Sequence, residues 1–438
     1  MPAKTYKYLK FTRSKDIAPW HVGYYINNDS IDSKYPLVPL RKLIAPQKKL
    51  IKKDNYDGTL PIVEKIVFKT GRVVFREKNE TGMDMYALKQ NDLLVSNINF
   101  HQGATALNTF GDIAASTHYQ PYKINVGIVY PEYLTLVLRS STFLSVVSRK
   151  KAQGIKNESG YSFIGSFSCP LPSLSKQQEL VKAYNDKVQH AEISDNQAEQ
   201  LESKIEEYLL NELRISYNSA KLHKGLNFIG FRNVNRWDCY NNKIMGESTV
   251  FQNTTLSQVI LSKPQYGAGY SSKEYDGETR YIRITDINED GSLTDEKVSA
   301  VGFLERYLLK ENDFLIARSG NTVGKTFLYS KEYGKAIFAG YLIKFELDTE
   351  KIAPKYLLYY TKCSVYKNWI NSNMRVFAQP NINSQQYLNS PVVLPPIDIQ
   401  NAIVEHIKKQ KKQIMALKQQ AEVLRKEALE EFEKEIFK

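Results

Sequence analysis

The sequence predicts an α+β fold of two tandem globular modules, each followed by a long helix. Two observations lead to this prediction: motifs from the first half of the chain return in the second half at a nearly constant offset, and each copy ends in a heptad pattern of apolar residues. So long a period excludes a small solenoid repeat of a few tens of residues. At 438 residues the chain is long enough for about two to three domains, and the duplication favours two.

The repeated motifs keep one register. The Leu-Pro-Ser-Leu segment at 171–174, followed by Gln177, returns as Leu-Pro-Pro-Ile at 394–397, followed by Gln400, at an offset of 223 residues. Further pairs at this or a similar offset are 91–94 with 312–315, 131–134 with 354–357, and 197–199 with 420–422. We therefore expect a first module at 1–170, its helix region at 171–222, a second module at 223–393 and a C-terminal helix at 394–438.

Each module is expected to mix short strands with one helix. The helix follows a Pro-x-Tyr-Leu signal, from Pro131 to about Arg149 and from Pro354 to about Ile370, because proline suits the first turn, where its missing N–H is not needed. Short apolar runs bounded by turn residues predict the strands. These runs are 65–68, 72–75 and 92–95 in the first module, and 281–284, 314–317 and 341–345 in the second.

The segment that ends each copy carries a heptad seam, since apolar residues recur in alternating steps of three and four. The first seam consists of Leu180, Tyr184, Ala191, Ala198, Leu201 and Ile205, and the second of Ile403, Ile407, Ile414, Leu417, Ala421, Leu424 and Ala428. Lys187 and Ser194 are polar interruptions of the first seam, and Gln410 takes the position between Ile407 and Ile414 in the second.

Two seams that match in register predict that the helices pair with each other as an antiparallel coiled coil with pseudo-twofold symmetry. Small alanines on the seam let the helix axes approach closely. A helix of about 40 residues spans on the order of 60 Å, so the pair can serve as a spacer between the modules. Packing of each helix on its own module is the alternative.

The composition favours an anionic partner and a soluble, cytoplasmic protein. The formal net charge is +13 and the sequence pI is near 9.2, which is typical of proteins that bind nucleic acid. The three cysteines are widely separated and lack metal-ligand spacing. No apolar run approaches the roughly 18 residues of a membrane span, and the first ten residues lack the apolar core of a signal peptide.

Equivalent loops in the two modules carry polar side chains suited to base edges. In the major groove Arg pairs with guanine, and Asn or Gln with adenine, through two hydrogen bonds. The candidates are Asn97, Asn99, His101 and Gln102 in the first module, and Arg318, Asn321, Thr322 and Lys325 in the second. A second candidate surface follows each short helix and is suited to phosphate contact: Lys150, Lys151, Gln153 and Lys156, and then Arg375 and Gln379. An ordinary polar turn or a solvated charged face is the alternative for each residue.

The second of these loops resembles a nucleotide-binding loop but lacks its geometry. Such a loop needs four residues between its first glycine and the Gly-Lys-Thr sequence, so that backbone N–H groups surround a phosphate. Here only three residues separate Gly320 from Gly324, and 326–330 reads as a strand where a helix is required. No methyltransferase motif, carboxylate cluster or histidine spacing for a metal is found either. We expect a binding protein without catalytic residues, metal or cofactor of its own.

Two variable α+β modules, each ending in Leu-Pro-x-Leu/Ile-x-x-Gln and a long helix, resemble the specificity subunit of type I restriction-modification systems. Besides 171–178 and 394–400, the segments that carry the resemblance are Arg-Trp-Asp at 236–238, 281–287 and 317–325. The first module departs from the pattern, with Pro-Trp-His at 19–21 and Ser-Asn-Ile at 96–98.

The resemblance implies that each module recognises a few base pairs of double-stranded DNA, in a split site whose gap is set by the paired helices. Half-sites about one turn apart lie roughly 34 Å from each other. Because the two loops differ, the halves should differ. The expected partners are two DNA adenine methylation subunits, which carry S-adenosylmethionine and flip out an adenine, and a restriction and translocase subunit that uses ATP.

Three other functions fit parts of the pattern. A recognition subunit of a related, type IIB-like cutting system would share this architecture. A coiled-coil scaffold whose modules bind protein would show association that is insensitive to salt, whereas DNA binding weakens steeply as salt rises. An isolated nucleotide-hydrolysing enzyme would turn over ATP.

Overall fold

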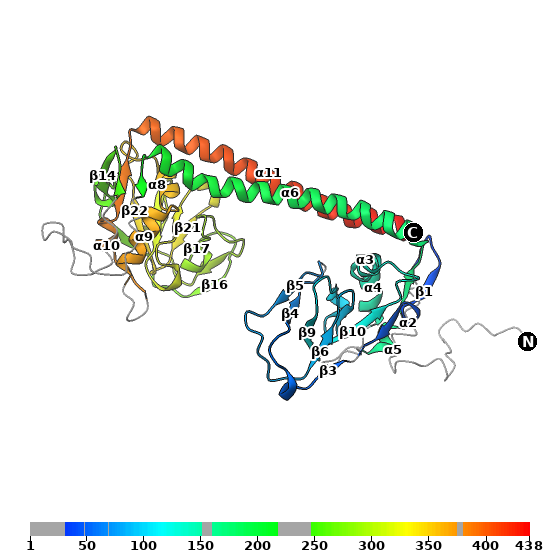
Figure 1. The fold of residues 1–438 in the computed structure, drawn as a ribbon. Coiled ribbons are helices and arrows are strands. Elements are labelled where there is room, and N and C mark those ends of the chain that lie inside the picture. Colours follow the sequence, from blue (N-terminus) through cyan, green and yellow to red (C-terminus); the bar gives the residue numbers. More distant parts are fainter. Residues whose placement is uncertain (1–30, 48, 69, 151–159, 218–246, 375–379) are drawn as a thin grey trace, which may run out of the picture. The chain divides into compact units, whose positions relative to one another are not determined.

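The structure is a computed structural model that describes residues 31–47, 49–68, 70–150, 160–217, 247–374 and 380–438. The chain divides into two compact units (Figure 1). Unit 1 comprises Met1–Asp195 and Gln419–Lys438, and unit 2 comprises Asn196–Lys418. Each unit therefore contains one module and a part of each long helix, whereas the predicted boundaries assigned each helix to a segment of its own.

Unit 1 contains a four-stranded antiparallel sheet with the order β2-β10-β7-β8 and a five-stranded sheet with the order β3-β6-β9-β4-β5. In the larger sheet β4 and β9 run parallel and the other neighbours antiparallel. A separate antiparallel pair joins β1 to β11. The strands are β1 (Leu37–Pro39), β2 (Ile44–Pro46), β3 (Leu50–Ile51), β4 (Ile62–Ile66), β5 (Val73–Phe75), β6 (Met85–Leu88), β7 (Leu93–Ser96), β8 (Thr105–Leu107), β9 (Ile113–Ser116), β10 (Tyr119–Ile124) and β11 (Ser168–Pro170).

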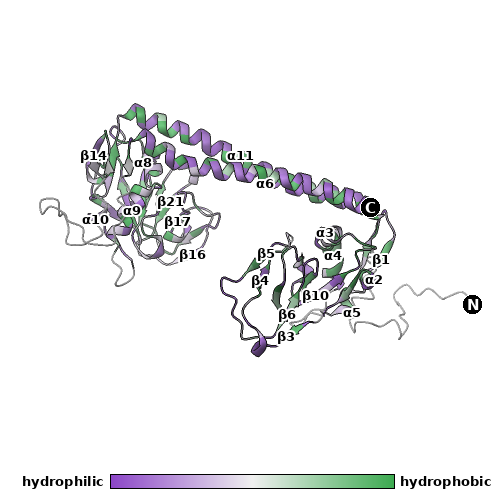
Figure 2. Ribbon diagram, in the orientation of Figure 1, coloured by the Kyte–Doolittle hydropathy of each residue, from purple (hydrophilic) through white to green (hydrophobic). Residues whose placement is uncertain are grey.

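Unit 2 contains a four-stranded antiparallel sheet with the order β15-β22-β19-β20 and four two-stranded pairs, β12-β13, β14-β23, β16-β18 and the parallel pair β17-β21. The strands are β12 (Ser216–Tyr217), β13 (Glu247–Ser248), β14 (Gln252–Thr255), β15 (Gln265–Tyr266), β16 (Ser272–Glu274), β17 (Arg280–Ile282), β18 (Val298–Ala300), β19 (Asp313–Ala317), β20 (Thr326–Leu328), β21 (Ala336–Phe338), β22 (Leu342–Glu346) and β23 (Pro391–Leu394). The buried strands β7 and β19 are mostly hydrophobic, whereas β14 and β16 are polar (Figure 2).

The two modules share one framework, which explains the repeated motifs. The order β2-β10-β7-β8 corresponds to β15-β22-β19-β20. Before β7 and β19, the repeated Asn-Asp motif forms the same turn. Asn91 and Asn312 are left-handed, with φ of 68° and 69°, a conformation that Asn tolerates better than most residues. The carboxylates of Asp92 and Asp313 each accept a hydrogen bond from a backbone N–H three residues earlier, at 2.8 Å.

The single helix expected in each module is in fact two helices, so this prediction was wrong. In unit 1, α3 (Pro131–Arg139) is followed by α4 (Ser141–Lys150), and in unit 2, α8 (Pro354–Tyr360) is followed by α9 (Ser364–Asn373). A carboxylate from a long helix caps each second helix. Glu433 accepts hydrogen bonds from the N–H and hydroxyl of Ser141 at 2.6 Å, and Glu206 accepts one from the N–H of Ser364 at 2.6 Å. A carboxylate at this end also complements the helix dipole.

Two long helices follow the modules, as expected, and they pack together. They are α6 (Leu174–Glu212) and α11 (Ile397–Ile436). Within unit 1 the start of α6 lies beside the end of α11, where Lys187 and Glu431 form an ion pair at 2.6 Å. Within unit 2 the end of α6 lies beside the start of α11, where the rings of Tyr208 and His406 stack at 3.8 Å. The pairing is therefore antiparallel in both units. Three short helices complete the modules: α2 (Leu40–Leu43), α5 (Tyr161–Ile164) and α10 (Ser384–Leu388).

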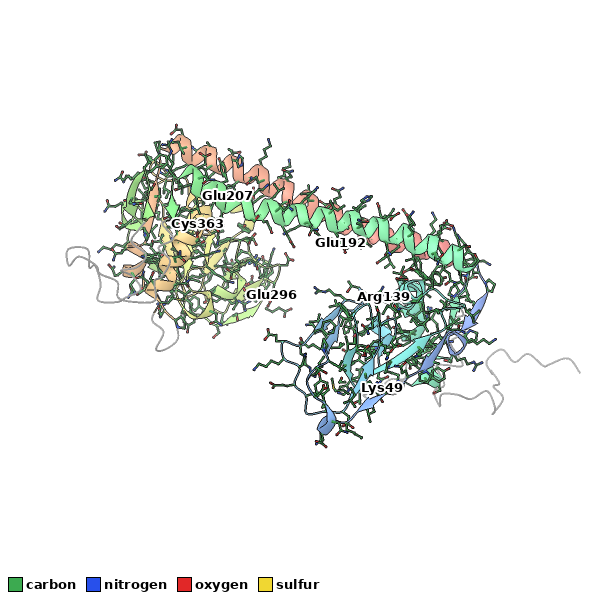
Figure 3. All side chains as sticks on the ribbon, viewed as in Figure 1. Lys49, Arg139, Glu192, Glu207, Glu296 and Cys363 are labelled. Carbon is green, nitrogen blue, oxygen red and sulfur yellow. The ribbon has the colours of Figure 1, made fainter. Side chains whose placement is uncertain are left out.

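Every residue of the predicted seam is buried or half-buried. Leu180, Ala191, Ala198, Ile403, Ile407, Ile414, Ala421 and Ala428 are buried, and Tyr184, Leu201, Ile205, Leu417 and Leu424 are half-buried. The polar interruptions have partners of their own. The Lys187 ammonium pairs with Glu431 and Glu427, and the Ser194 hydroxyl donates to the carbonyl of His190. Glu192 and Glu207, labelled in Figure 3, lie on the exposed face of α6.

The ends of the long helices also pack into the modules: the first turns of each helix pack on the module that precedes it, as in the alternative prediction, and the last turns pack on the other module. Leu180 at the start of α6 and Phe432 at the end of α11 belong to the core of unit 1. Ile403 at the start of α11 and Leu209 at the end of α6 belong to the core of unit 2. Among the described residues no helix has the length and apolar character required to cross a membrane.

Candidate nucleic-acid interface

The two candidate loops occupy equivalent places, directly after the central strands β7 and β19. The first turn of each loop is held in the same way: the N–H of Asn97 donates to the carbonyl of His118, and the N–H of Arg318 donates to the carbonyl of Tyr341, both at 2.9 Å. A short 3-10 turn follows in each, Phe100–Gln102 and Gly320–Thr322. The frame is therefore shared, and the side chains that it presents differ.

In unit 2 the Arg318 side chain lies on an aromatic ring. Its guanidinium carbon is 5.0 Å from the centroid of the Tyr266 ring, within the range of a cation–π contact. The Tyr266 hydroxyl donates to the Ser384 hydroxyl at 3.0 Å and accepts from the Ser384 N–H at 3.1 Å. Within the described part of the chain, the buried Nε of Arg318 has no hydrogen-bond partner. A planar guanidinium held in this way can present two parallel donors to a guanine edge.

The base of this loop is also fixed to the rest of the module. The carbonyl of Arg318 accepts from the N–H of Ile382, and the N–H of Gly320 donates to the carbonyl of Pro380, both at 2.9 Å. The hydroxyl of Tyr387 on α10 donates a hydrogen bond to the carbonyl of Ala317 and accepts one from the N–H of Gly324. The loop is thus set before any ligand arrives.

The other candidate residues in this loop differ in their exposure and in the partners of their side chains within the protein. Asn321 is exposed. Thr322 is half-buried and its hydroxyl donates to the Ser319 carbonyl at 3.0 Å. Lys325 is engaged within the protein, since its ammonium pairs with Glu289 at 2.9 Å and donates to the Ile287 carbonyl at 3.3 Å. As expected, the residues that follow form a strand, β20 (Thr326–Leu328), and not the helix of a nucleotide-binding loop.

In unit 1 the candidates are divided between exposed and half-buried positions. Gln102 is exposed, while Asn97, Asn99 and His101 are half-buried. The side chain of Asn97 donates to the carbonyl of Thr117 at 3.3 Å. The carbonyl of His101 accepts from the Ser148 hydroxyl of α4 at 3.4 Å. This loop therefore offers amide and imidazole groups at the place where the second module offers an arginine.

Two exposed residues were missed by sequence reasoning. His118 and Tyr341 are the last residues before β10 and β22, and their carbonyls hold the candidate loops. Both are exposed, and Tyr341 is 57% exposed. The offset of 223 residues between them is the signal that could have paired them.

Of the second candidate surface the structure describes one residue. The ammonium of Lys150, at the end of α4, lies 5.9 Å from the centroid of the Phe167 ring. The remaining candidates lie outside the described residues: Lys151, Gln153, Lys156, Arg375 and Gln379. The Arg-Trp-Asp segment at 236–238 lies outside them as well.

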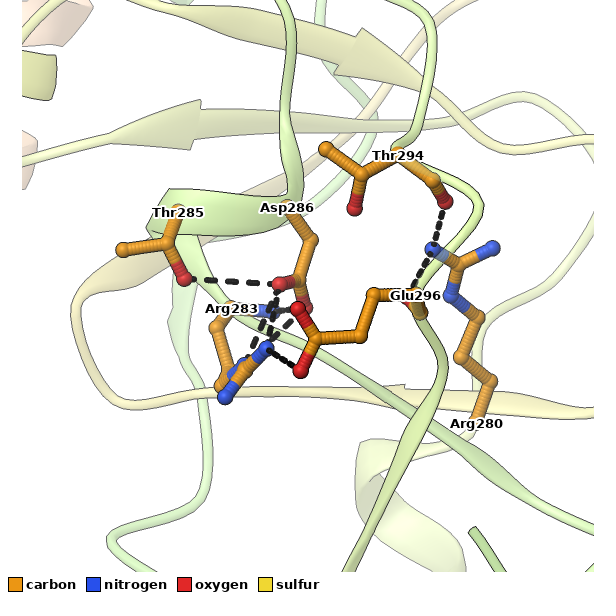
Figure 4. Close-up of polar contacts among 6 residues, drawn as sticks. All are labelled: Arg280, Arg283, Thr285, Asp286, Thr294 and Glu296. Atoms are coloured by element: carbon orange, nitrogen blue, oxygen red, sulfur yellow. Dashed lines mark hydrogen bonds and ion pairs between the residues drawn. The ribbon is translucent and has the colours of Figure 1, made fainter. Parts of the chain in front are cut away.

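The segment at 281–287 supports the fold of the module (Figure 4). The guanidinium of Arg283 contacts the carboxylate of Asp286 through Nε and Nη2, at 3.1 and 2.8 Å to the same oxygen, and the N–H of Arg283 donates to the other oxygen at 2.9 Å. The neighbouring Arg280 is 4% exposed and donates to the carbonyls of Thr294 and Glu296 at 2.7 and 3.1 Å. These arginines tie the segment to the loop that follows it.

The repeated glutamine of the Leu-Pro motif is structural in both units. Gln177 and Gln400 are fully buried. Gln400 accepts a hydrogen bond from the Ala353 N–H at 2.8 Å and donates to the carbonyls of Lys351 and Pro395. Gln177 makes the equivalent three hydrogen bonds in unit 1. Each side chain therefore joins the first turn of a long helix to the segment that enters α3 or α8.

Comparison with known proteins gives a match to one family model and a shared fold. Residues 252–425, from β14 into α11, match the family model of the type I restriction modification DNA specificity domain. The specificity subunit of the type I restriction enzyme EcoEI from Escherichia coli is 27% identical over 106 residues, which are 23% of this chain and 18% of the relative. The match thus spans less than a fifth of that relative.

Two solved structures are similar over nearly the whole chain. A subunit from a study of assembly and conformational transition of the type I restriction-modification system has a TM-score of 0.56 and 16% identity, over 92% of this chain and 97% of that one. The HsdS subunit of Thermoanaerobacter tengcongensis has a TM-score of 0.42 and 15% identity, over 92% of this chain and 96% of that one. At these identities the first of the two supports the shared fold and no more.

Proposed function

We propose a function for this chain on the premise that it belongs to the family of type I restriction-modification specificity subunits. The chain recognises a split, asymmetric site in double-stranded DNA and supplies no catalysis. Its first module reads one half-site and its second module reads the other.

One observation carries this proposal: the same frame presents different side chains in the two modules. The N–H groups of Asn97 and Arg318 make equivalent hydrogen bonds at 2.9 Å, yet one side chain is an amide and the other a guanidinium. An amide suits adenine and a guanidinium suits guanine. Two modules that recognise different half-sites require this combination of the same backbone arrangement and different side chains. A positive net charge of +13 adds the sequence-independent attraction to phosphates.

The long helices supply assembly and spacing in this proposal. The exposed faces of α6 and α11 dock DNA adenine methylation subunits, which carry S-adenosylmethionine, and a restriction subunit that uses ATP joins the complex. The buried seam keeps the two helices paired, so their length sets the gap between the half-sites. The complex works in the cytoplasm, where the DNA is.

The spacing role is tested by removing one heptad from each long helix. Seven residues are two turns, or about 10 Å of helix, so the preferred gap should change. DNA fragments selected from a random pool by the assembled complex would give the gap directly. An unchanged gap with intact half-sites would refute the spacing role and leave the recognition role in place.

The recognition role is tested in the same selection with the unaltered complex. We expect one split motif with two different halves, and an affinity that falls steeply as salt rises. Enrichment of no motif, together with association that is insensitive to salt, would instead identify the chain as a protein-binding scaffold.

A further inference from the structure

We propose that unit 2 carries a built phosphate-binding pocket beside the Arg318 loop, formed by Lys362, Lys367 and the amides of Asn321 and Asn371, and that it holds one phosphate of the DNA backbone. The inference rests on the proposed function and adds a contact to it. The cavity has a volume of about 190 Å³ and is also lined by Lys325 and Glu289.

The four residues that form the pocket come from the loop after β19, from α9 and from the turn between α8 and α9, where Lys362 lies. Asn321 belongs to the 3-10 turn of the loop, three residues after Arg318. Lys367 and Asn371 lie one turn apart on α9, so their side chains project from the same face of the helix. Gly324 closes the contact between loop and helix. Its φ is +86°, and a Cβ there would come within 2.9 Å of Ile370. The loop can thus approach α9 closely only with glycine at this position.

The charges around the cavity favour an anion. The ammonium of Lys325 is neutralised locally by Glu289, at 2.9 Å. Among the charged groups that act on Lys362, the ammonium groups of Lys367 and Lys411 stand against the carboxylates of Asp290 and Glu289, and Glu289 is already paired with Lys325. Two ammonium groups and two amide N–H₂ groups in a concave site match the acceptor-rich surface of a phosphate.

Lys362 is held in place by the fold. Its ammonium donates to the Thr326 carbonyl at 3.1 Å. An ammonium has three donors, of which this hydrogen bond uses one. Burial lowers the pKa of Lys362 to about 8, and the carboxylates of Asp290 and Glu289 only partly offset that effect. A phosphate that enters the pocket should therefore stabilise the charged form of this buried lysine more than it would stabilise a solvated lysine.

Within the described residues the first module keeps only part of this pocket. At the offsets that relate the two modules, Lys362 is matched by Arg139, whereas the positions of Lys367 and Asn321 are taken by Leu144 and Phe100, both of which are buried in the core of unit 1. The contact through Lys367 is therefore specific to the half-site read by the second module.

The test uses the assembled complex and a duplex of the selected motif in which one phosphate at a time is replaced by an uncharged methylphosphonate. In the unaltered complex one linkage near the second half-site should weaken binding several-fold. In the Lys367→Gln variant that linkage should have no further effect, and the slope of log K against log salt should fall by about one. Lys331→Gln, an exposed lysine of the same module that does not line the cavity, is the matched control.

Each contrary result has a distinct meaning. Binding of the duplex without coupling between Lys367 and any linkage would overturn the pocket and leave the proposed function intact. Protection of the protein by inorganic phosphate against heat, lost in Lys367→Gln, with no coupled linkage, would assign the pocket to free phosphate and overturn its DNA role. Failure of the unaltered complex to bind any duplex would overturn both the pocket and the proposed function.

Discussion

At the scale of single residues, the side chains that build the frame differ from those that face solvent at the candidate interface. Gln177 and Gln400 are fully buried and satisfied by three hydrogen bonds each. Asn321 and Gln102, by contrast, are exposed on the two candidate loops. Repeated motifs therefore mark structure here, and under the proposed function the residues that differ between the copies are the candidates for recognition.

The buried glutamine should matter for stability. Gln400→Leu leaves one N–H and two carbonyls without the partner they have now. Because an unsatisfied buried polar group costs about 1–3 kcal/mol, the thermal midpoint should fall clearly. Gln385→Leu, at an exposed position on α10, is the control and should change it little. Equal midpoints for the two variants would show that the glutamine hydrogen bonds contribute nothing.

The Tyr266 ring should position Arg318 for base reading. Tyr266→Ala removes the ring on which the Arg318 guanidinium lies. We expect the free-energy preference for the correct base at one position of the second half-site to fall by about 1–3 kcal/mol. Arg318→Ala should have the same effect. Tyr266→Phe keeps the ring and should keep the preference. Competition binding with single-base variants of the site measures this. A uniform loss of affinity across all sequences would instead make Arg318 a phosphate contact.

Lys362 should give DNA binding a pH dependence. Its pKa of about 8 means that it is mostly charged at pH 7 and mostly neutral at pH 9. Only the charged form attracts phosphate, so affinity should fall as pH rises through 8. The groups that face it are Asp290, Glu289, Lys367 and Lys411. Lys362→Met should bind more weakly at pH 7 and lose this decline. If the Lys362→Met variant shows the same decline, the group whose titration causes it is not Lys362.

At the scale of elements, the long helices depend on small residues at the seam. Ala191 on α6 and Ala421 on α11 are fully buried. A larger side chain at such a position has no space and forces the neighbouring helix away. The ion pairs beside the seam, such as Arg425 with Asp195 at 2.6 Å, are exposed and add only about 0.2–1 kcal/mol each. Packing, more than charge, holds these helices together.

Ala191→Leu should therefore destabilise the helix pair. We expect a loss of about 1–3 kcal/mol from overpacking, measured as a lower urea midpoint. Glu192→Leu, one residue away on the exposed face of α6, is the matched control (Figure 3). If both variants unfold at the same urea concentration, Ala191 is not at a close helix contact.

Some elements could be predicted from the sequence and others could not, for a physical reason. The strands β7 and β19 and both long helices follow from local periodicity. The structure places β7, β19 and α11 within a few residues of the prediction, whereas α6 ends at Glu212, well before the end of the region predicted for it at 222. The break between α3 and α4 does not, because the carboxylate that caps α4 comes from Glu433, 292 residues away in the chain. The contact between Arg318 and Tyr266 likewise joins the loop after β19 to β15, a strand of the same sheet that lies far away in the sequence.

At the scale of the whole molecule, duplication and divergence together support the proposed function. One framework is used twice in a single chain, so both modules depend on the same pair of helices. The surfaces that the framework presents have diverged, from Asn97 and His118 in one module to Arg318 and Tyr341 in the other. A site read by this chain should consequently be split and asymmetric.

The most direct test of this account is a methylome. The chain is expressed together with its methylation subunits in a host that lacks such systems, and modified bases are mapped by single-molecule sequencing. We predict one new split motif with two different halves and N6-methyladenine in each half. A complex that assembles but produces no new motif, or a motif with identical halves, would contradict the account.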